Sequence, residues 1–367
     1  MSSLCIDARW LYSGIGTYTF NMVRELGQCP ELELHCITMS EHRAKLQPLC
    51  DRISIVDVPI YSVREQFAIE RVARKFSVLH VPHYNAPLLR SGTLLITIHD
   101  LTHILDDQLR NTWKSRLYAR PMMRMAAKKA AHIFTDSAYS KRQILEHLDV
   151  PAEKVTVSYL GVGPQFSPEC REMAMQTVQR ECGVKRPYVL YVGNLKPHKN
   201  VTGLLRAFAL AQNRTARDYE LLIIGDDSSG GELTGLAAGL GIGAVTRFAG
   251  RVSDDTLRSA YSAADLTVLP SFEEGFGLPV LESMACGTPV ACSRAASLPE
   301  VGGDAAEYFD PRDCDSIATA MERVLSATPE DRAELQRKGF EQAGRYTWSA
   351  CAKRHLEVYR RYLSTVS

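Results

Sequence analysis

The sequence predicts an α/β protein built from two Rossmann-like domains, each with a parallel sheet. Short apolar runs, such as 4–6, 221–224 and 266–269, alternate with helical patterns, and this alternation is typical of parallel α/β layers. Glycines stand between a strand and a helix near Gly14 and again near Gly277. A chain of 367 residues is long enough for two domains with complete cores.

Composition narrows the class of protein before any motif is considered. A formal net charge of +1 argues against a nucleic-acid binder, which would be strongly basic. The ten cysteines are scattered without a Cys-x-x-Cys pair, so no zinc site is predicted and the thiols are expected to be reduced. Residues 1–7 lack the pattern of a signal segment, and no apolar run approaches the ~18 residues of a membrane-spanning helix. We therefore expect a cytoplasmic protein.

The stretch 266–287 predicts a phosphate site. An apolar run at 266–269 indicates a buried strand, and glycines in the loop that follows let the backbone approach a ligand closely. Pro279 suits the first position of a helix, and Gly287 suits the residue just past its end. Because the N-terminus of a helix presents free N–H groups, this arrangement attracts phosphate.

Two carboxylates, Glu274 and Glu282, flank the predicted phosphate site. An ionised carboxylate only accepts hydrogen bonds, and sugar or ribose hydroxyls are the obvious donors to it. The alternative is that Glu274 merely caps the helix and Glu282 is a solvated surface acid.

This stretch resembles the double-glutamate signature of family 4 glycosyltransferases, which are retaining enzymes of the GT-B fold. The matching residues are Glu274, Gly275, Phe276, Gly277, Leu278 and Pro279, followed by Glu282. The resemblance implies that Glu274 holds hydroxyls of the donor sugar and Glu282 the nucleotide ribose. It also implies two domains facing a central cleft, and a C-terminal helix that crosses back to the first domain.

The first glycine pair, Gly14 and Gly16, precedes a helical stretch predicted from Thr17 to Leu26. One interpretation is a nicotinamide-cofactor loop with Glu41 as ribose acceptor, but the third glycine of that fingerprint is replaced by Thr19. Family 4 members carry a similar turn, and the resemblance implies that it closes over the donor phosphates.

Polar residues follow two strands predicted at 76–83 and 94–98. Ligands in open α/β sheets bind beyond the carboxyl ends of strands, which places His99 well, although a structural histidine is the alternative. The resemblance, carried by Ile98, His99 and Asp100, implies that His99 contacts the donor sugar near the reacting carbon. At the end of the preceding strand, His83, Tyr84 and Asn85, with His80, are candidates for the acceptor cleft.

A basic helical pattern is predicted over 110–131. Four cations, Arg116, Arg120, Arg124 and Lys128, recur every four residues and form one stripe. Such a helix suits an anionic membrane surface or an acceptor that carries phosphate, and the alternative is an ordinary solvated face. Peripheral attachment to the inner face of the membrane is therefore one expectation.

Breaks at Pro164, Pro168 and Pro187 place a domain boundary in this region. We predict an acceptor-binding domain at 1–165, a donor-binding domain at 166–345, and a segment at 346–367 whose helix, from about Trp348 to Leu363, packs back on the first domain. The second domain restarts with a strand at 188–192. A run at 193–200 follows, in which Lys199 precedes a helix.

The resemblance implies that Lys199 pairs with the donor diphosphate and that the backbone near Val252 reads the base. One position departs from the family, because Asn194 stands where many members have an arginine. Lys196, His198 or Arg251 are candidates for the missing charge. Asp254 and Asp313 are expected to cap helices, so the Asp313-Cys314-Asp315 run is not interpreted as a metal motif.

Together these features predict a glycosyltransferase that needs no metal or other cofactor. The resemblance implies retention of the anomeric configuration and catalytic roles for His99, Lys199 and Glu274. The amino-acid sequences of 98–102 and 193–200 resemble those of mannosyltransferases of polysaccharide and glycolipid biosynthesis. GDP-mannose is therefore the first hypothesis for the donor, and a glycan or lipid-linked saccharide is the hypothesis for the acceptor. The alternatives are another donor such as UDP-glucose or UDP-GlcNAc, an epimerase or phosphorylase of the same fold, a silent nucleotide-sugar-binding protein, and a dinucleotide oxidoreductase.

Overall fold

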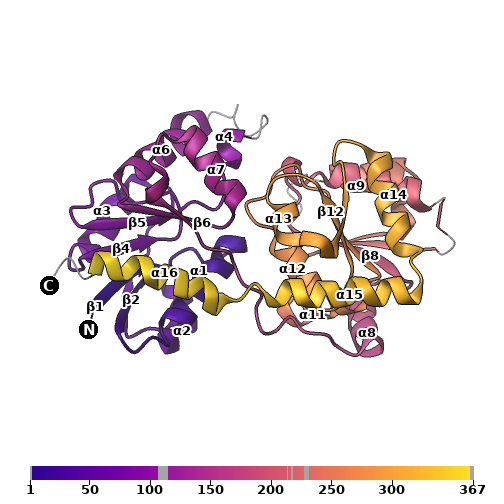
Figure 1. The fold of residues 1–367 in the computed structure, drawn as a ribbon, viewed down its shortest axis with the longest axis horizontal. Helices are drawn as coiled ribbons and strands as arrows, with labels where there is room; N and C mark the ends of the chain where they lie inside the picture. Colours follow the sequence, from indigo (N-terminus) through magenta and orange to yellow (C-terminus); the bar gives the residue numbers. More distant parts are fainter. Residues whose placement is uncertain (1, 106–114, 213, 216–217, 227–230, 364–367) are drawn as a thin grey trace. The chain divides into compact units, whose positions relative to one another are not determined.

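The computed structural model describes residues 2–105, 115–212, 214–215, 218–226 and 231–363. It divides into two compact units (Figure 1). Unit 1 comprises Met1–Gly161 together with Thr347–Ser367, and unit 2 comprises Val162–Tyr346. The boundary predicted from the prolines was 165/166, and the boundary predicted before the last helix was 345/346.

Unit 1 contains a seven-stranded parallel sheet in the order β3-β2-β1-β4-β5-β6-β7. Its strands are β1 (Ser2–Asp7), β2 (Leu32–Thr38), β3 (Arg52–Ile55), β4 (Val78–Val81), β5 (Thr93–Thr97), β6 (His132–Thr135) and β7 (Val155–Val157). Its α-helices are α1 (Ser13–Leu26), α2 (Arg43–Leu46), α3 (Val63–Ala73), α4 (Thr102–Leu105), α6 (Arg120–Lys129), α7 (Ala138–His147) and α16 (Trp348–Leu363). Buried side chains of α3, α6 and α7 form one core with alternate residues of the strands, such as Leu79 and Ile96.

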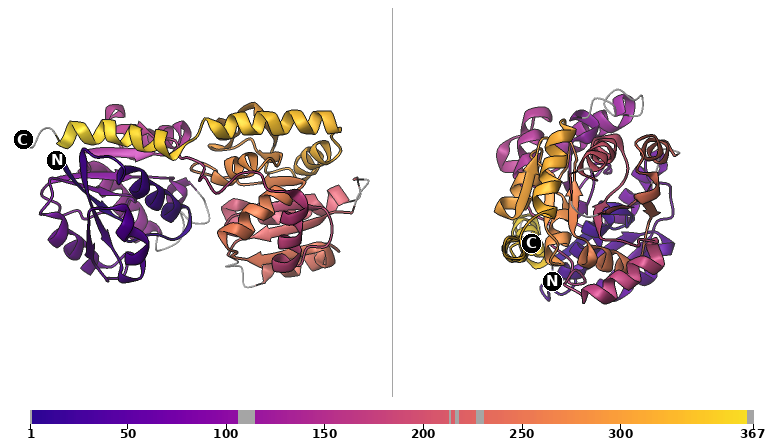
Figure 2. Two further views of the ribbon diagram at one scale, coloured as in Figure 1. Left: turned by 90° about the horizontal axis from the view of Figure 1, so that it is seen from below. Right: turned by 90° about the vertical axis from the view of Figure 1, so that its right-hand side faces the viewer.

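The last helix, α16, belongs to unit 1 and packs against α1 (Figures 1 and 2). A chain of buried hydrogen bonds joins it to the sheet. His355 Nε2 lies 2.8 Å from the Tyr18 hydroxyl, which lies 2.9 Å from Thr97 Oγ1. Thr97 Oγ1 lies 2.9 Å from His80 Nε2, and His80 Nδ1 lies 2.7 Å from the Tyr359 hydroxyl. This row of hydrogen bonds begins at His355 and ends at Tyr359, which both lie on α16. The helix therefore completes the first domain, as the resemblance implies.

Unit 2 contains a six-stranded parallel sheet in the order β10-β9-β8-β11-β12-β13. Its strands are β8 (Tyr188–Val192), β9 (Glu220–Ile224), β10 (Thr246–Gly250), β11 (Leu266–Leu269), β12 (Val290–Ser293) and β13 (Ala306–Phe309). Its α-helices are α8 (Arg171–Cys182), α9 (Val201–Gln212), α10 (Glu232–Gly239), α11 (Asp254–Ala263), α12 (Leu278–Ala285), α13 (Leu298–Gly302), α14 (Cys314–Leu325) and α15 (Pro329–Gly344).

Side chains alternate across the second sheet and create two cores. Val189 and Tyr191 pack on one side with residues of α9 and α14, while Tyr188 and Leu190 pack on the other with residues of α8 and α11. Successive side chains of a strand point to opposite faces of the sheet. A strand whose two faces are both covered by helices therefore needs apolar residues at every position, without alternating polar ones.

Several predicted boundaries are wrong. The first helix begins at Ser13 and not at Thr17, so Gly14 and Gly16 lie in its first turn. The cap of α11 is Ser253, whose hydroxyl accepts from the Thr256 N–H, and not Asp254. In contrast, the cap predicted at Asp313 is confirmed, since its carboxylate accepts from the Asp315 N–H at 2.9 Å.

The predicted basic helix 110–131 is also changed. Residues 110–114 lie outside the described residues, Ser115–Ala119 form a π-helical turn, and α6 ends at Lys129. Within the described part of the chain, no helix combines the length and apolar character that crossing a membrane needs.

Candidate active site

The loops that follow β8 and β11 meet at the point where the strand order of unit 2 reverses. These two strands are neighbours in the sheet although far apart in the chain. Open α/β sheets bind ligands at such a switch point, outside the carboxyl ends of the strands. The two loops are joined directly, because the Phe272 N–H donates to the His198 carbonyl oxygen at 2.8 Å.

Lys199 and Glu274, one from each loop, form an ion pair. Lys199 Nζ lies 2.7 Å from Glu274 Oε1, and the two side chains are only 14% and 13% exposed. The Ser271 hydroxyl donates to the same carboxylate oxygen at 3.0 Å. The structure therefore brings together the residue predicted to pair with phosphate and the residue predicted to hold sugar hydroxyls.

The helix α12 begins beside this pair, and its entry requires glycine. Gly277 has a φ of 105°, and a Cβ there would lie 2.6 Å from Leu298 Cδ2. The hydroxyl of Ser297 lies 2.9 Å from the Glu274 carbonyl oxygen and 2.8 Å from that of Phe276, so it fixes the loop. Phe276 itself is buried and packs edge-on against Tyr346.

Glu282 lies within α12, and it is buried, so the alternative of a solvated surface acid is wrong. The Tyr261 hydroxyl donates to Glu282 Oε2 at 2.8 Å. Burial raises the pKa of Glu282 to about 7, because desolvation disfavours the carboxylate more than this hydrogen bond favours it. A hydroxyl donor from a ligand would stabilise the ionised form further.

The turns after β8, β9 and β10 are packed together. A Cβ at Gly225 would lie 1.8 Å from the Gly193 carbonyl oxygen, so the first two turns touch backbone to backbone. Asn194 is exposed at this edge, and the next residue, Leu195, donates its N–H to the Asp226 carbonyl oxygen at 3.2 Å.

Arg251 follows β10 and forms an ion pair with Asp226, with its Nε 2.8 and 2.7 Å from the two carboxylate oxygens. A guanidinium group is thus present near Asn194, although it is paired with an acid. Val252 is half-buried against the core below α11. Both residues accordingly lie at the edge that carries the Lys199 loop.

In unit 1, both ring nitrogens of His99 are engaged. Nδ1 lies 2.7 Å from Asp136 Oδ2 and Nε2 lies 3.2 Å from the Pro82 carbonyl oxygen. A carbonyl oxygen only accepts, so Nε2 carries a proton. Burial alone would lower the pKa of His99, but the Asp136 carboxylate outweighs burial and raises it. Sequence reasoning did not identify Asp136 as this partner.

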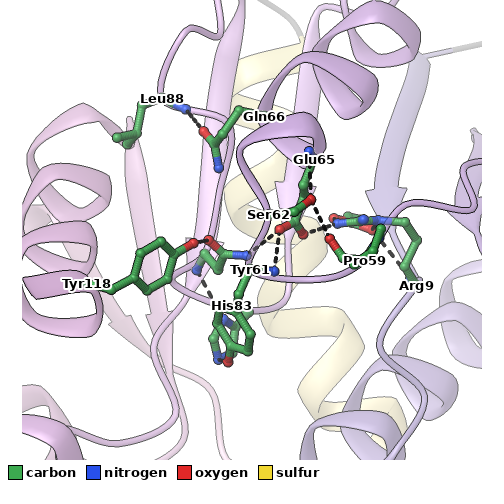
Figure 3. A network of polar contacts seen from close by, with 11 residues as sticks. Arg9, Pro59, Tyr61, Ser62, Glu65, Gln66, His83, Leu88 and Tyr118 are labelled. Carbon is green, nitrogen blue, oxygen red and sulfur yellow. Dashed lines mark hydrogen bonds and ion pairs between the residues drawn. The ribbon is translucent and has the colours of Figure 1, made fainter. Parts of the chain in front are cut away.

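The residues predicted for the acceptor cleft fall into different settings. His83 and Asn85 line a pocket at the end of β4, whereas Tyr84 is buried and His80 belongs to the hydrogen-bond chain of α16. Asn85 joins a network that includes Arg9 and Glu65, which sequence reasoning missed (Figure 3). These residues are far apart in the chain, and no local motif links them.

Of the first glycine pair, only Gly16 is explained by packing. A Cβ there would lie 2.2 Å from the carbonyl carbon of Leu11, while one at Gly14 would meet nothing within 4 Å. Gly16 therefore lets the first turn of α1 pack directly against the backbone of Leu11, in the connection between β1 and α1.

Two family models match this chain. The model for glycosyltransferase family 4 matches residues 12–166, and the model for glycosyl transferases group 1 matches 177–342. The chain belongs to the family 4 glycosyltransferases. With its two parallel-sheet Rossmann-like domains it has the GT-B fold.

Curated relatives of this glycosyltransferase include mannosyltransferases. The O-antigen chain mannosyltransferase B of Escherichia coli is 28% identical, with 95% of this chain and 96% of the relative covered. The MMP alpha-(1->4)-mannosyltransferase of Mycolicibacterium hassiacum is 30% identical, with 70% of this chain and 61% of the relative covered.

Solved structures share the fold of this glycosyltransferase over almost its whole length. Sucrose-phosphate synthase from Thermosynechococcus elongatus has a TM-score of 0.81 at 19% identity, covering 100% of both chains. The HepE protein of Anabaena in complex with UDP-glucose has a TM-score of 0.81 at 16% identity, covering 98% of this chain and 100% of its own.

Proposed function

We propose that this glycosyltransferase transfers mannose from GDP-mannose to a hydroxyl of a glycan or lipid-linked saccharide, with retention of the anomeric configuration. The observation that carries the proposal is the ion pair of Lys199 and Glu274 at the start of α12, at the switch point of unit 2. The mannosyltransferase names of its relatives support mannose as the sugar.

The proposed chemistry follows from the groups at this point. The bond between the anomeric carbon and the diphosphate breaks through an oxocarbenium-like state, and the bonding electrons leave with the diphosphate. The Lys199 ammonium and the free N–H groups of α12 stabilise the charge that develops there. The acceptor oxygen bonds to the same face of the sugar, and its proton passes to a phosphate oxygen, so no protein nucleophile is needed.

Glu274 is proposed to accept hydrogen bonds from donor-sugar hydroxyls, and its pairing with Lys199 and Ser271 holds it in place. Glu282 is proposed to accept from the ribose. The backbone at Val252 is proposed to read the base, and Gly275, Gly277 and Leu278 to approach the donor.

Two further parts of the chain have proposed donor contacts. If the Arg251 guanidinium leaves the Asp226 carboxylate and pairs with the donor phosphate, Arg251 supplies the positive charge that Asn194 lacks. His99, held by Asp136, is proposed to contact the donor sugar near the reacting carbon, and the turn that contains Gly14 and Gly16 is proposed to contact the phosphates. No metal is required for this mechanism.

A different donor is the main alternative, since HepE was solved with UDP-glucose. A same-fold epimerase is distinguished by acceptor dependence, because transfer releases free nucleotide only with acceptor present, whereas epimerisation releases none. A silent nucleotide-sugar-binding protein would show donor binding and no turnover with any acceptor.

Peripheral attachment to the cytoplasmic face of the membrane is proposed for α6 and the turn before it. Leu117 and Met125 are 76% and 49% exposed, and Arg124 and Lys128 are exposed near them. Apolar side chains beside cations suit an anionic bilayer surface. Co-sedimentation with phosphatidylglycerol vesicles should be lost in Leu117→Asp/Met125→Asp, and equal binding of both proteins would contradict the attachment.

Thermal stabilisation by GDP-, UDP-, ADP- and dTDP-linked sugars, with NAD as control, tests the function. A true donor at a hundredfold excess over its dissociation constant adds about 2.7 kcal/mol to the free energy of unfolding. We expect GDP-mannose to act selectively, Glu282→Ala to weaken this effect, and Glu274→Ala to lower mainly kcat. Turnover should survive EDTA. Stabilisation by NAD alone would refute the function.

A further inference from the structure

One buried asparagine joins the loops of the candidate active site in unit 2. Asn200 directly follows Lys199 and is 8% exposed. It ends the turn Pro197–Lys199 and precedes α9, with φ and ψ of 56° and 37°. This left-handed conformation is unfavourable for most residues that have a Cβ, and asparagine is one of the few that adopt it readily. The chain can therefore leave the turn and enter α9 at this residue.

The side-chain amide of Asn200 makes three hydrogen bonds, called the Asn200 clamp below. Its Oδ1 accepts from the Gly203 N–H at 3.2 Å and so satisfies one of the free N–H groups at the start of α9. Its Nδ2 donates to the carbonyl oxygens of Pro270 at 3.1 Å and Pro311 at 2.7 Å. The Asn200 clamp thus ties the loop after β8 to the connections that follow β11 and β13.

The chemistry of these partners selects asparagine at position 200. Two carbonyl oxygens need two N–H donors, while the Gly203 N–H needs an acceptor, and among side chains the amides of asparagine and glutamine offer this combination. Of these two amides, asparagine is the one favoured at a positive φ. Aspartate would keep the acceptor but would direct an oxygen at two carbonyl oxygens, leaving them without a donor.

The Asn200 clamp closes a ring around the ion pair of Lys199 and Glu274. Pro270, whose carbonyl oxygen accepts from Asn200, immediately precedes Ser271. The Ser271 hydroxyl donates to Glu274 Oε1, and this oxygen lies 2.7 Å from Lys199 Nζ. Lys199 is the chain neighbour of Asn200, so the ring is complete. The two loops are therefore joined both through the side chains of the ion pair and through Asn200.

We infer that Asn200 is a positioning residue for the donor diphosphate, because it clamps the loop of Lys199 to the loop of Glu274 and so holds the Lys199 ammonium beside the start of α12. A lysine side chain has a flexible stem, and its charge stabilises a leaving diphosphate best when it is already in place. That the held ammonium pairs with a diphosphate rests on the proposed function; the clamp between the loops does not.

Hydrogen exchange measured by mass spectrometry tests the Asn200 clamp on the full chain without a ligand. Asn200→Gly adopts the positive φ without strain and removes all three side-chain bonds, so exchange should be faster in peptides from both loops, 193–200 and 271–277. The matched control is Thr328→Ala, which removes the cap of α15, where the Thr328 hydroxyl accepts from the Asp331 N–H at 3.1 Å. The control should exchange faster at the start of α15 and leave both loops unchanged.

Titration calorimetry with GDP, and with UDP as the alternative nucleotide, tests the positioning role. We expect Asn200→Gly to weaken binding of the nucleotide about tenfold and Thr328→Ala to leave it unchanged. In a Lys199→Ala background, Asn200→Gly should weaken binding little further, because the group that it positions is gone. Asn200→Asp keeps the acceptor for the Gly203 N–H but lacks both donors. It replaces Asn200→Gly if that variant does not fold, and it should show the same loss.

Unchanged exchange of the 271–277 loop in Asn200→Gly would overturn the clamp. Losses that simply add in the double variant would show that Asn200 does not act through Lys199. Failure of the proposed function is a separate outcome. If neither GDP nor UDP binds the unchanged protein but Asn200→Gly speeds exchange in both loops, the donor site and the diphosphate role fail and the clamp stands. If a nucleotide binds and Asn200→Gly leaves its affinity unchanged, the positioning role fails alone.

Discussion

At the scale of a single residue, Glu282 links burial to ligand binding. Its folded-state pKa is raised from 4.5 to about 7, so it contributes stability that is present below about 4.5 and is lost as the pH rises through about 7. The carboxylate accepts hydrogen bonds from the Tyr261 hydroxyl and from a ribose hydroxyl more strongly than the neutral acid does. Donor binding should therefore favour deprotonation.

We expect the affinity for GDP-mannose to increase as the pH rises from 6 to 8, by about fivefold if binding lowers the pKa of Glu282 from about 7 by about one unit. Calorimetric titration in two buffers of different ionisation enthalpy measures the protons released. Glu282→Gln keeps the size of the side chain but not its titration, so its affinity should be lower and independent of pH in this range. A Gln variant with an unchanged pH profile would contradict the role.

At the scale of an element, the entry to α12 depends on Gly277. Alanine at a φ of 105° is strained, and its Cβ would also meet Leu298 Cδ2 at 2.6 Å. We expect Gly277→Ala to lower the free energy of unfolding by about 1–3 kcal/mol and to weaken donor binding by displacing the loop that carries Glu274.

The matched control for this substitution is Gly183→Ala. Gly183 also has a positive φ, of 71°, but nothing lies within 4 Å of a Cβ there, and it ends α8 away from the donor loops. Urea unfolding should show a lower free energy of unfolding for both variants, because alanine is strained at either positive φ, while donor titration should show weaker binding only for Gly277→Ala. Equal donor affinities of the Gly277→Ala and Gly183→Ala variants would show that the conformation of the Gly277 loop does not affect donor binding.

The elements also show where sequence reasoning succeeds. The strands at 188–192 and 266–269 and the helix α16 were predicted with the observed bounds, because apolar runs and caps are local signals. The start of α1 at Ser13 was not, since Gly16 is explained only by its approach to Leu11. The partners Asp136, Tyr261 and Glu65 were missed for a different reason. Each pairs with a residue distant in the chain, and only the sheet order brings them together.

At the scale of the whole molecule, α16 completes a domain whose other residues end at Gly161. Its His355 is neutral in the folded state, because Nδ1 donates to the Cys351 carbonyl oxygen at 2.9 Å and Nε2 accepts from the Tyr18 hydroxyl. Burial lowers the pKa of His355 to about 3, from 6.5. A lowered histidine pKa contributes stability that is present above about 6.5 and is lost as the pH falls toward about 3.

Acidification should therefore weaken the attachment of α16, and at pH 5 the loss from His355 alone is about 2 kcal/mol. Urea unfolding of the protein and of His355→Gln between pH 8 and pH 5 isolates this contribution from those of the carboxylates. Glutamine does not titrate, so the difference in stability between the two proteins should shrink by that amount on acidification. Parallel stability curves would show that His355 does not change its protonation on unfolding, and that packing and the hydrogen bonds of Tyr18 and Tyr359 hold α16 without a contribution from this titration.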